Sequence, residues 1–199
     1  MKAVGMLVAM AMGLALPGSM TAQMHDSDEW HAAVAPLALP EASRAGAEVR
    51  AWTADGGLRV VRAGSNGMIC LSDRPGEGLA VACYHEGLEP FMKRGRELRA
   101  EGIEGMQRMQ VRWNEARAGT LPMPEVAAMV YNLRLPEEPA DPSTVDPAKG
   151  GRLHAVYIPN ATAESTGLPT EPGEGAAPWL MWPGEPSSHV MISLPPSEG

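Results

Sequence analysis

Four short stretches in the first half of the chain are rich in hydrophobic residues and are separated by polar, turn-forming segments. These stretches are 48–53, 58–62, 68–72 and 79–85. Hydrophobic stretches of this length that are bounded by turn residues predict β-strands. Asp55-Gly56 and Asn66-Gly67 supply the positive φ that tight hairpin turns need. We therefore expect an antiparallel β meander of four strands.

The period changes to that of an α-helix after residue 86. Leu88, Phe91 and Leu98 fall at helical spacing, and Pro90 lies in the first turn, where its missing N–H is harmless. A second apolar stripe consists of Met106, Met109, Trp113 and Ala116. This second stripe ends before Gly119, so the pattern predicts two consecutive amphipathic helices.

Prolines and acidic residues dominate the chain beyond residue 121, which holds 14 of the 19 prolines. Three strand-like segments remain there, at 126–133, 153–158 and 189–194, and they are separated by long loops at 136–151 and 162–178. The expected fold class is α+β. An antiparallel meander and two amphipathic helices are followed by a loop-rich, proline-rich and acidic part that contributes further strands.

The first residues have the pattern of a signal peptide. Lys2 precedes an apolar run at 3–16, and a Pro-Gly break and small residues follow it. That run is shorter than the ~20 apolar residues that span a bilayer. We expect a signal peptide at 1–22, a flexible Ala/Pro-rich segment at 23–40 and one α+β domain at 41–199. Since no second hydrophobic span follows, the exported chain is expected to be periplasmic or secreted, without a transmembrane segment.

Export makes the two cysteines informative, because an isolated pair in an oxidising compartment forms a disulfide. If Cys70 faces Cys83, the centre of the hairpin falls between Gly76 and Glu77, inside the turn-rich segment 73–78. Opposed residues of antiparallel strands lie ~4.5–5.5 Å apart, within the reach of a disulfide. We therefore predict a structural Cys70–Cys83 disulfide. The other face of this hairpin, which we expect to be the core side, carries Ile69, Leu71, Ala82 and Tyr84.

The formal net charge of −8 argues against a nucleic-acid partner, since phosphate contacts need a basic surface. Basic residues do gather on the two predicted helices. They are Lys93, Arg94, Arg96, Arg99, Arg108, Arg112 and Arg117. Acidic residues are interleaved with them, which is typical of a solvated helix face. We expect no nucleic-acid partner and a solvated surface at these positions.

Histidine is scarce, and three of the five histidines lie on predicted strands or strand ends. His85, His154 and His189 would converge if these strands shared a sheet, and Glu86 lies beside the first of them. Three nitrogen or oxygen ligands could hold a divalent metal ion such as zinc and leave a position for water. The alternative is that each histidine is half-buried and hydrogen-bonded to the backbone. No other cofactor is identified, because phosphate loops and dinucleotide fingerprints are absent.

Three further motifs resemble functional patterns without completing them. The segment 85–89 lacks the second histidine of a zinc-protease helix. The segment 63–67 lacks the first glycine of a nucleophile elbow and lies between two strands, so Ser65 is predicted to be a turn residue. Trp179 and Trp182 form either an exposed aromatic platform for a sugar or partner, or a cap on the edge of the sheet. No catalytic residue is identified.

Several segments carry a resemblance to known proteins. They are Asn66–Cys70, Ala82–Glu86 with Phe91-Met92, and Pro178–Trp182 through His189–Ile192. These segments resemble small exported bacterial proteins of uncharacterised function. The resemblance implies an exported bacterial protein, and it implies no activity, cofactor or catalytic residue.

The sequence therefore favours an exported, non-catalytic binding or envelope-associated module whose partner is a small ligand or an envelope protein. The alternative is a metal-dependent hydrolase that uses His85, His154 and His189, with Glu86 as the base. We assign no oligomeric state.

Overall fold

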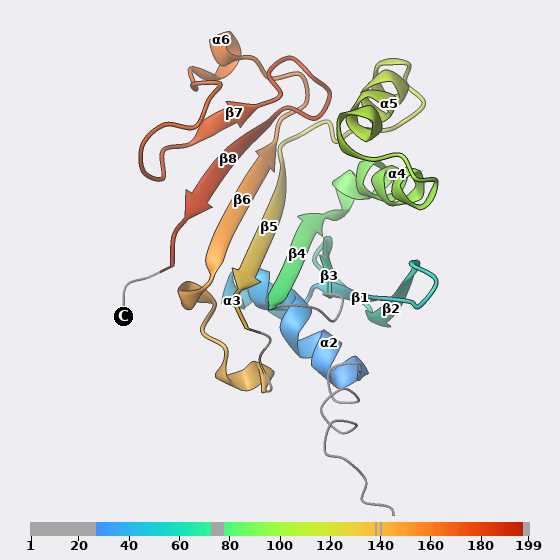
Figure 1. Ribbon diagram of the computed structural model, residues 1–199, viewed down its shortest axis with the longest axis vertical. Coiled ribbons are helices and arrows are strands. Elements are labelled where there is room, and N and C mark those ends of the chain that lie inside the picture. The colour runs from blue at the N-terminus through green and yellow to red at the C-terminus, as the bar shows by residue number, and fades with distance from the viewer. Residues whose placement is uncertain (1–26, 73–77, 138, 140, 197–199) are drawn as a thin grey trace, which may run out of the picture.

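The computed structural model describes residues 27–72, 78–137, 139 and 141–196, and Figure 1 shows one twisted sheet with helices on both sides. The expected α+β class is confirmed. The strands are β1 (Glu48–Trp52), β2 (Leu58–Arg62), β3 (Met68–Leu71), β4 (Leu79–His85), β5 (Ala128–Leu135), β6 (Gly151–Tyr157), β7 (Trp179–Met181) and β8 (His189–Leu194). The predicted signal peptide, residues 23–26 and most of the turn 73–78 lie outside the described residues.

The eight strands follow the order β2-β1-β3-β4-β5-β6-β8-β7. Every neighbouring pair is antiparallel except β1 and β3, which are parallel. The predicted meander would have placed β2 between them. Instead β1 takes the interior position, where Val49 and Ala51 are fully buried, and β2 forms one edge of the sheet, where Val60 is 58% exposed.

A short connection at residues 63–67 makes this strand order feasible by passing around the start of β1. The backbone N–H of Ser65 donates to the Gly46 carbonyl at 2.7 Å, which ties the connection to the chain just before β1. A Cβ atom at Gly64 would lie 2.4 Å from the backbone nitrogen of Glu48. Glycine is therefore required where the two backbones touch.

The cysteine hairpin has the predicted register. Cys70 pairs with Cys83 across β3 and β4, and a disulfide joins the two residues. We call the side of the sheet that bears these cysteines the disulfide face, and the opposite side, which bears Tyr84 and Ala155, the cleft face.

The N-terminal segment differs from the expected flexible stretch 23–40. It forms α2 (Asp28–Val34), a 3-10 turn η1 (Ala35–Ala38) and α3 (Glu41–Arg44). Val34, Leu37 and Leu39 are buried, and they join the cysteines in the largest hydrophobic cluster. The largest hydrophobic cluster therefore lies on the disulfide face. The opposite face, which was expected to be the core side, carries a second cluster that includes Ile69 and Tyr84.

The two predicted amphipathic helices are confirmed as α4 (Glu89–Ala100) and α5 (Gly105–Arg117). Figure 1 shows them side by side at one end of the sheet, and α4 and α5 contact each other. Met92 of α4 packs against a second hydrophobic cluster that includes Tyr84, Val130 and Ala155. These two helices therefore cover part of the cleft face and leave the rest open.

The C-terminal part contributes β5 to β8, of which β7 was not expected. The remaining short elements are η2 (Glu86–Leu88), η3 (Pro142–Thr144), η4 (Pro147–Lys149) and α6 (Ala163–Thr166). Trp113 of α5 donates from Nε1 to Ser187 Oγ at 2.7 Å, and its ring meets Trp182 edge-on, with centroids 5.4 Å apart. Trp182 thus joins α5 to the β7–β8 connection. Within the described ranges, no helix is long and apolar enough to cross a membrane.

Candidate functional site

The strand register separates the three histidines that were expected to converge. His154 is opposite Ile192 and lies on the disulfide face, whereas His189 is opposite Tyr157 and lies on the cleft face. His85 shares the disulfide face with His154, but the positions are two strands and two residue rows apart, about 12 Å by the spacing of a β-sheet. The residues that the structure describes contain no group of three metal-binding side chains. The sheet therefore does not bring these imidazoles to a common point.

Each histidine instead has a local partner. His85 Nδ1 accepts from the backbone N–H of Gly87 at 3.1 Å, and His154 meets the ring of Tyr131 edge-on. His189 Nδ1 donates to the Ser187 carbonyl at 2.7 Å, and its ring stacks on Tyr157. His85 and His189 have the backbone hydrogen bonds that the alternative expected, although His85 is exposed and His189 is buried, whereas His154 is half-buried and contacts an aromatic ring instead. Glu86 lines a different cavity, beside Glu48, Arg50 and Glu89.

Acidification from pH 7.5 to 5.5 is expected to lower the melting temperature. Burial lowers the pKa of both His154 and His189, so on acidification the unfolded chain binds protons from about pH 6.5, before the folded chain does. Folding stability is then lost as the pH falls through this window. Melting curves of the His189→Gln variant should show a shallower dependence, because glutamine still donates to the Ser187 carbonyl and does not titrate. An unchanged slope would contradict this assignment.

A cavity of about 750 Å³ lies between the cleft face and the two helices. Apolar and aromatic side chains of four strands form its floor, namely Tyr84, Val130, Ala155, Tyr157 and Met191. Four arginines line it from the helices: Arg96 and Arg99 from α4, and Arg108 and Arg112 from α5. We call this cavity the arginine cleft. The sequence predicted a solvated helix face at these four positions. Arg99 is exposed as expected, whereas Arg96 and Arg108 are half-buried and Arg112 is buried.

Arg112 is the most buried of these arginines, with 7% of its surface exposed. Its guanidinium lies 4.0 Å from the centroid of the Phe91 ring, and Nη1 donates to the Phe91 carbonyl at 3.3 Å. Burial lowers the pKa of Arg112 to about 10. Among the described residues, no carboxylate lies within ion-pair distance of Arg99, Arg108 or Arg112. The cleft therefore holds a buried cation whose charge is not balanced by a neighbouring acid.

Gly95 makes room for this guanidinium inside α4. A Cβ atom at this position would lie 2.8 Å from Arg112 Nη1. Glycine in the interior of a helix costs roughly 0.5–1 kcal/mol relative to alanine. This glycine is the one sequence signal that could have shown that Arg112 packs against α4.

A hydrogen-bonded network around Glu89 fixes Arg96 at the wall of the arginine cleft. Glu89 accepts from Arg50 at 2.6 Å, from Arg96 at 2.8 Å and from the Tyr84 hydroxyl at 2.5 Å. Burial acts to raise the pKa of Glu89, but the Tyr84 hydrogen bond and the two guanidinium groups outweigh it, so its pKa lies below the usual value. Arg96 is thus engaged by a carboxylate, which leaves the other three arginines of the cleft to face a ligand.

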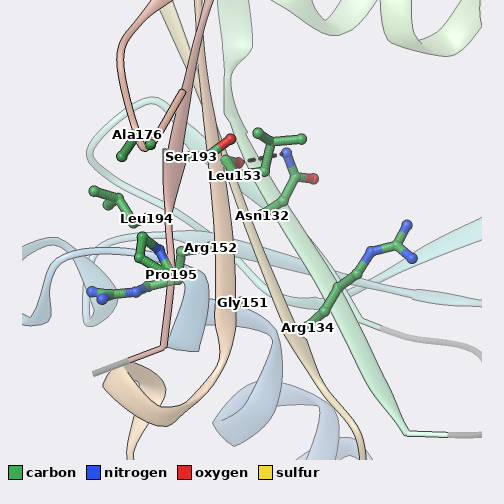
Figure 2. Close-up of a pocket in the computed structure, with 10 residues that line it drawn as sticks. Asn132, Arg134, Gly151, Arg152, Leu153, Ala176, Ser193, Leu194 and Pro195 are labelled. Carbon is green, nitrogen blue, oxygen red and sulfur yellow. Dashed lines mark hydrogen bonds between the residues drawn. The ribbon is translucent and has the colours of Figure 1, made fainter. Parts of the chain in front are cut away.

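A second cavity, of about 690 Å³, continues along the same face of the sheet (Figure 2). It shares Asn132 and Leu153 with the arginine cleft. Asn132 Nδ2 donates to the Leu153 carbonyl at 3.0 Å, as the dashed line in Figure 2 shows. Leu153 is 37% exposed, which is high for a leucine on a strand that pairs on both sides. Arg134 and Arg152 also line this second cavity, so both cavities have arginines among their lining residues.

Comparison of the chain with protein-family models, with curated protein sequences and with solved structures found no match. The chemistry of the site therefore rests on its own residues.

Proposed function

We propose that this chain is a non-catalytic binding module that holds a small anionic organic ligand, a carboxylate or a phosphate, in the arginine cleft. The observation that carries the proposal is the buried guanidinium of Arg112, which opens into the cavity without a carboxylate partner among the described residues. An unpaired buried charge is costly, and an anionic ligand would supply the missing counter-charge. Guanidinium groups also match carboxylate and phosphate oxygens in geometry.

The same residues favour binding over catalysis. Arginine keeps its proton at neutral pH and so does not serve as an acid or a base there. His189, the histidine of the cleft, donates its Nδ1 proton to a backbone carbonyl and stacks on Tyr157. The groups that surround the cavity are thus suited to hold and orient an anion.

The proposed module acts outside the cytoplasm, in the periplasm or after secretion. The Cys70–Cys83 disulfide supports this location, because disulfides persist in oxidising compartments and are rare in the cytosol.

Inorganic phosphate and acetate are expected to raise the melting temperature above that in sodium chloride of the same ionic strength. A ligand that binds only the folded state stabilises it by RT ln(1 + [L]/Kd), so the melting temperature should rise with the anion concentration. The Arg108→Gln variant should bind either anion about tenfold more weakly, because it loses a charged hydrogen-bond donor. Isothermal titration calorimetry measures the loss directly.

Two further variants make this test specific. Lys93→Gln removes one positive charge from α4 at an exposed position paired with Glu97, so its affinity should equal that of the natural chain. Gly95→Ala retains every charge but crowds Arg112 Nη1, so its affinity should fall. Equal weakening in Lys93→Gln and Arg108→Gln would show non-specific screening and overturn the proposal, as would an absence of binding by both anions.

A further inference from the structure

We infer that the ligand of the arginine cleft carries a tetrahedral dianion, as a phosphate monoester does, and that Arg108 and Arg112 bind this group together. This inference rests on the proposed function and selects the phosphate class from the two kinds of anion named there. It follows from the spacing of the two arginines on α5, from the neutral groups that accept their hydrogen bonds and from the balance of charges that line the cleft.

Arg108 and Arg112 lie one helical turn apart on the same side of α5, and both line the arginine cleft. Residues at positions i and i+4 of a helix have Cβ atoms about 5–6 Å apart, and like charges at this spacing destabilise the helix. Burial is the main cause of the lowered pKa of Arg112, and the charge of Arg108 lowers it further. The two cations therefore lie close enough to repel each other.

The hydrogen bonds of these two side chains do not offset their charge. Arg112 donates to the carbonyls of Phe91 and Arg108 and to the sulfur of Met109, and all three acceptors are neutral. Arg108 Nε is buried and has no hydrogen-bond partner among the described residues. A buried donor without an acceptor is unfavourable, because it has lost its hydrogen bond to water. An anion held between the two arginines would supply the negative charge that their neutral partners lack.

A dianion fits this pair of arginines better than a carboxylate does. A carboxylate brings one negative charge and two oxygens in one plane, so the fork of a single guanidinium is enough to bind it. A phosphate monoester carries close to two negative charges at pH 7 and has three acceptor oxygens. Because these oxygens are arranged tetrahedrally, they can face two guanidinium groups at once and neutralise both.

The other charged groups of the cleft leave this positive charge in excess. Arg99 lies one turn after Gly95 on α4, on the side of that helix that meets Arg112, and its side chain is exposed. Arg96 is already engaged by a carboxylate. Asp55, at the β1–β2 turn, is the one carboxylate among the described residues that line the cleft. A ligand with two negative charges is therefore attracted more strongly than a ligand with one.

Four small anions of known charge and shape test this inference on the full chain at pH 7.5 and constant ionic strength. Methanesulfonate and methyl phosphate are both tetrahedral, but the first is a monoanion and the second is mostly a dianion. Sulfate is a tetrahedral dianion, and malonate carries its two charges on separate carboxylates. By isothermal titration calorimetry, sulfate and methyl phosphate should bind about tenfold more tightly than methanesulfonate, and also more tightly than malonate.

A pH series changes the charge of methyl phosphate while its shape stays the same. The second pKa of a phosphate monoester is about 6, so the dianion becomes the main species between pH 5.5 and pH 7.5. Relative to sulfate, the affinity for methyl phosphate should rise about threefold over this range. Sulfate keeps its charge throughout and so corrects for the titration of the protein, including His189 and Asp55, which line the cleft. The absence of this relative gain would contradict the inference.

The Arg108→Gln variant locates the second charge. It should reduce the preference for sulfate over methanesulfonate to less than about threefold, because one buried cation remains. Lys93→Gln, which removes an exposed charge of α4 paired with Glu97, is the matched control and should retain the full preference. A preference that survives in Arg108→Gln would place the second charge elsewhere and overturn the inference.

The comparison of the anions uses the natural chain, so it decides the question even where a variant fails to fold. Equal affinities for methanesulfonate and sulfate, or tighter binding of malonate than of sulfate, would overturn this inference and leave the proposed function intact. If none of these four anions binds, and neither acetate nor inorganic phosphate binds, both fail.

Discussion

Replacing both cysteines, as Cys70→Ala with Cys83→Ala, is expected to lower the free energy of unfolding by about 3 kcal/mol. The disulfide closes a loop between residues 13 positions apart, and in the chain-entropy model its loss gives that freedom back to the unfolded chain. For a domain of this size, the melting temperature should fall by about 6–12 °C. Calorimetry of the purified variant measures the change.

The control for this prediction is the natural protein with and without a reductant. Mass spectrometry of the natural chain should show no alkylatable thiol, even after unfolding, until a reductant is added, because both cysteines are held in the disulfide. Reductant should leave the melting temperature of the double alanine variant unchanged. Two thiols that are alkylated after unfolding without a reductant would contradict the assignment of a structural disulfide.

The Leu39→Ala variant is expected to lose about 2–5 kcal/mol of stability, a large effect for a residue near the start of the described part of the chain. Leu39 follows η1 and is only 2% exposed within the largest hydrophobic cluster. Truncation removes its transfer free energy and leaves a cavity. Urea denaturation monitored by tryptophan fluorescence gives the change in the free energy of unfolding.

Glu41→Ala serves as the matched control, because it removes an exposed side chain two positions further along. Its stability should change by less than about 0.5 kcal/mol. If Leu39→Ala were as neutral as Glu41→Ala, the N-terminal segment would be a loose extension and not part of the core.

The sequence correctly predicted those elements whose hydrophobic pattern and turn residues lie close together along the chain. The cysteine hairpin was predicted with the register that pairs Cys70 with Cys83, because the turn residues and the reach of a disulfide restrict the same few residues. The stripe through Phe91 and Leu98 likewise identified α4, and both side chains are buried. Period and spacing within about 15 residues were sufficient for these elements.

The structure differs from the predicted fold where segments far apart in the sequence compete for the same place in the sheet or over its face. The order β2-β1-β3 depends on how much of each strand is buried by neighbours far along the chain, which alternation within one strand does not report. The alanines and prolines of the segment 23–40 led to the prediction that it is flexible. Its Trp30, Val34 and Leu37 nevertheless cover the disulfide face, since that apolar face would otherwise be open to water.

The candidate site was missed for a related reason. Interleaved charges on α4 and α5 do indicate an exposed face in an isolated helix, and Lys93 and Arg94 do pair with acidic residues on or near the surface. The packing angle between two helices and a sheet decides which charges remain inside. Gly95 is the sequence feature that reflects this packing, because the absence of a side chain there leaves room for the guanidinium of Arg112.

The position of the N-terminal segment over the disulfide has a consequence for the timing of oxidation. The carbonyl oxygen of Ala35 lies 3.3 Å from Cys83 Sγ, so η1 closes the approach that an attacking thiolate would need. The bond must therefore form while residues 27–40 are still undocked. Once they dock, the lifetime of the bond depends on how often the segment detaches as well as on the surrounding thiol concentration. Residues 27–40 thus slow the reduction of the disulfide that they cover.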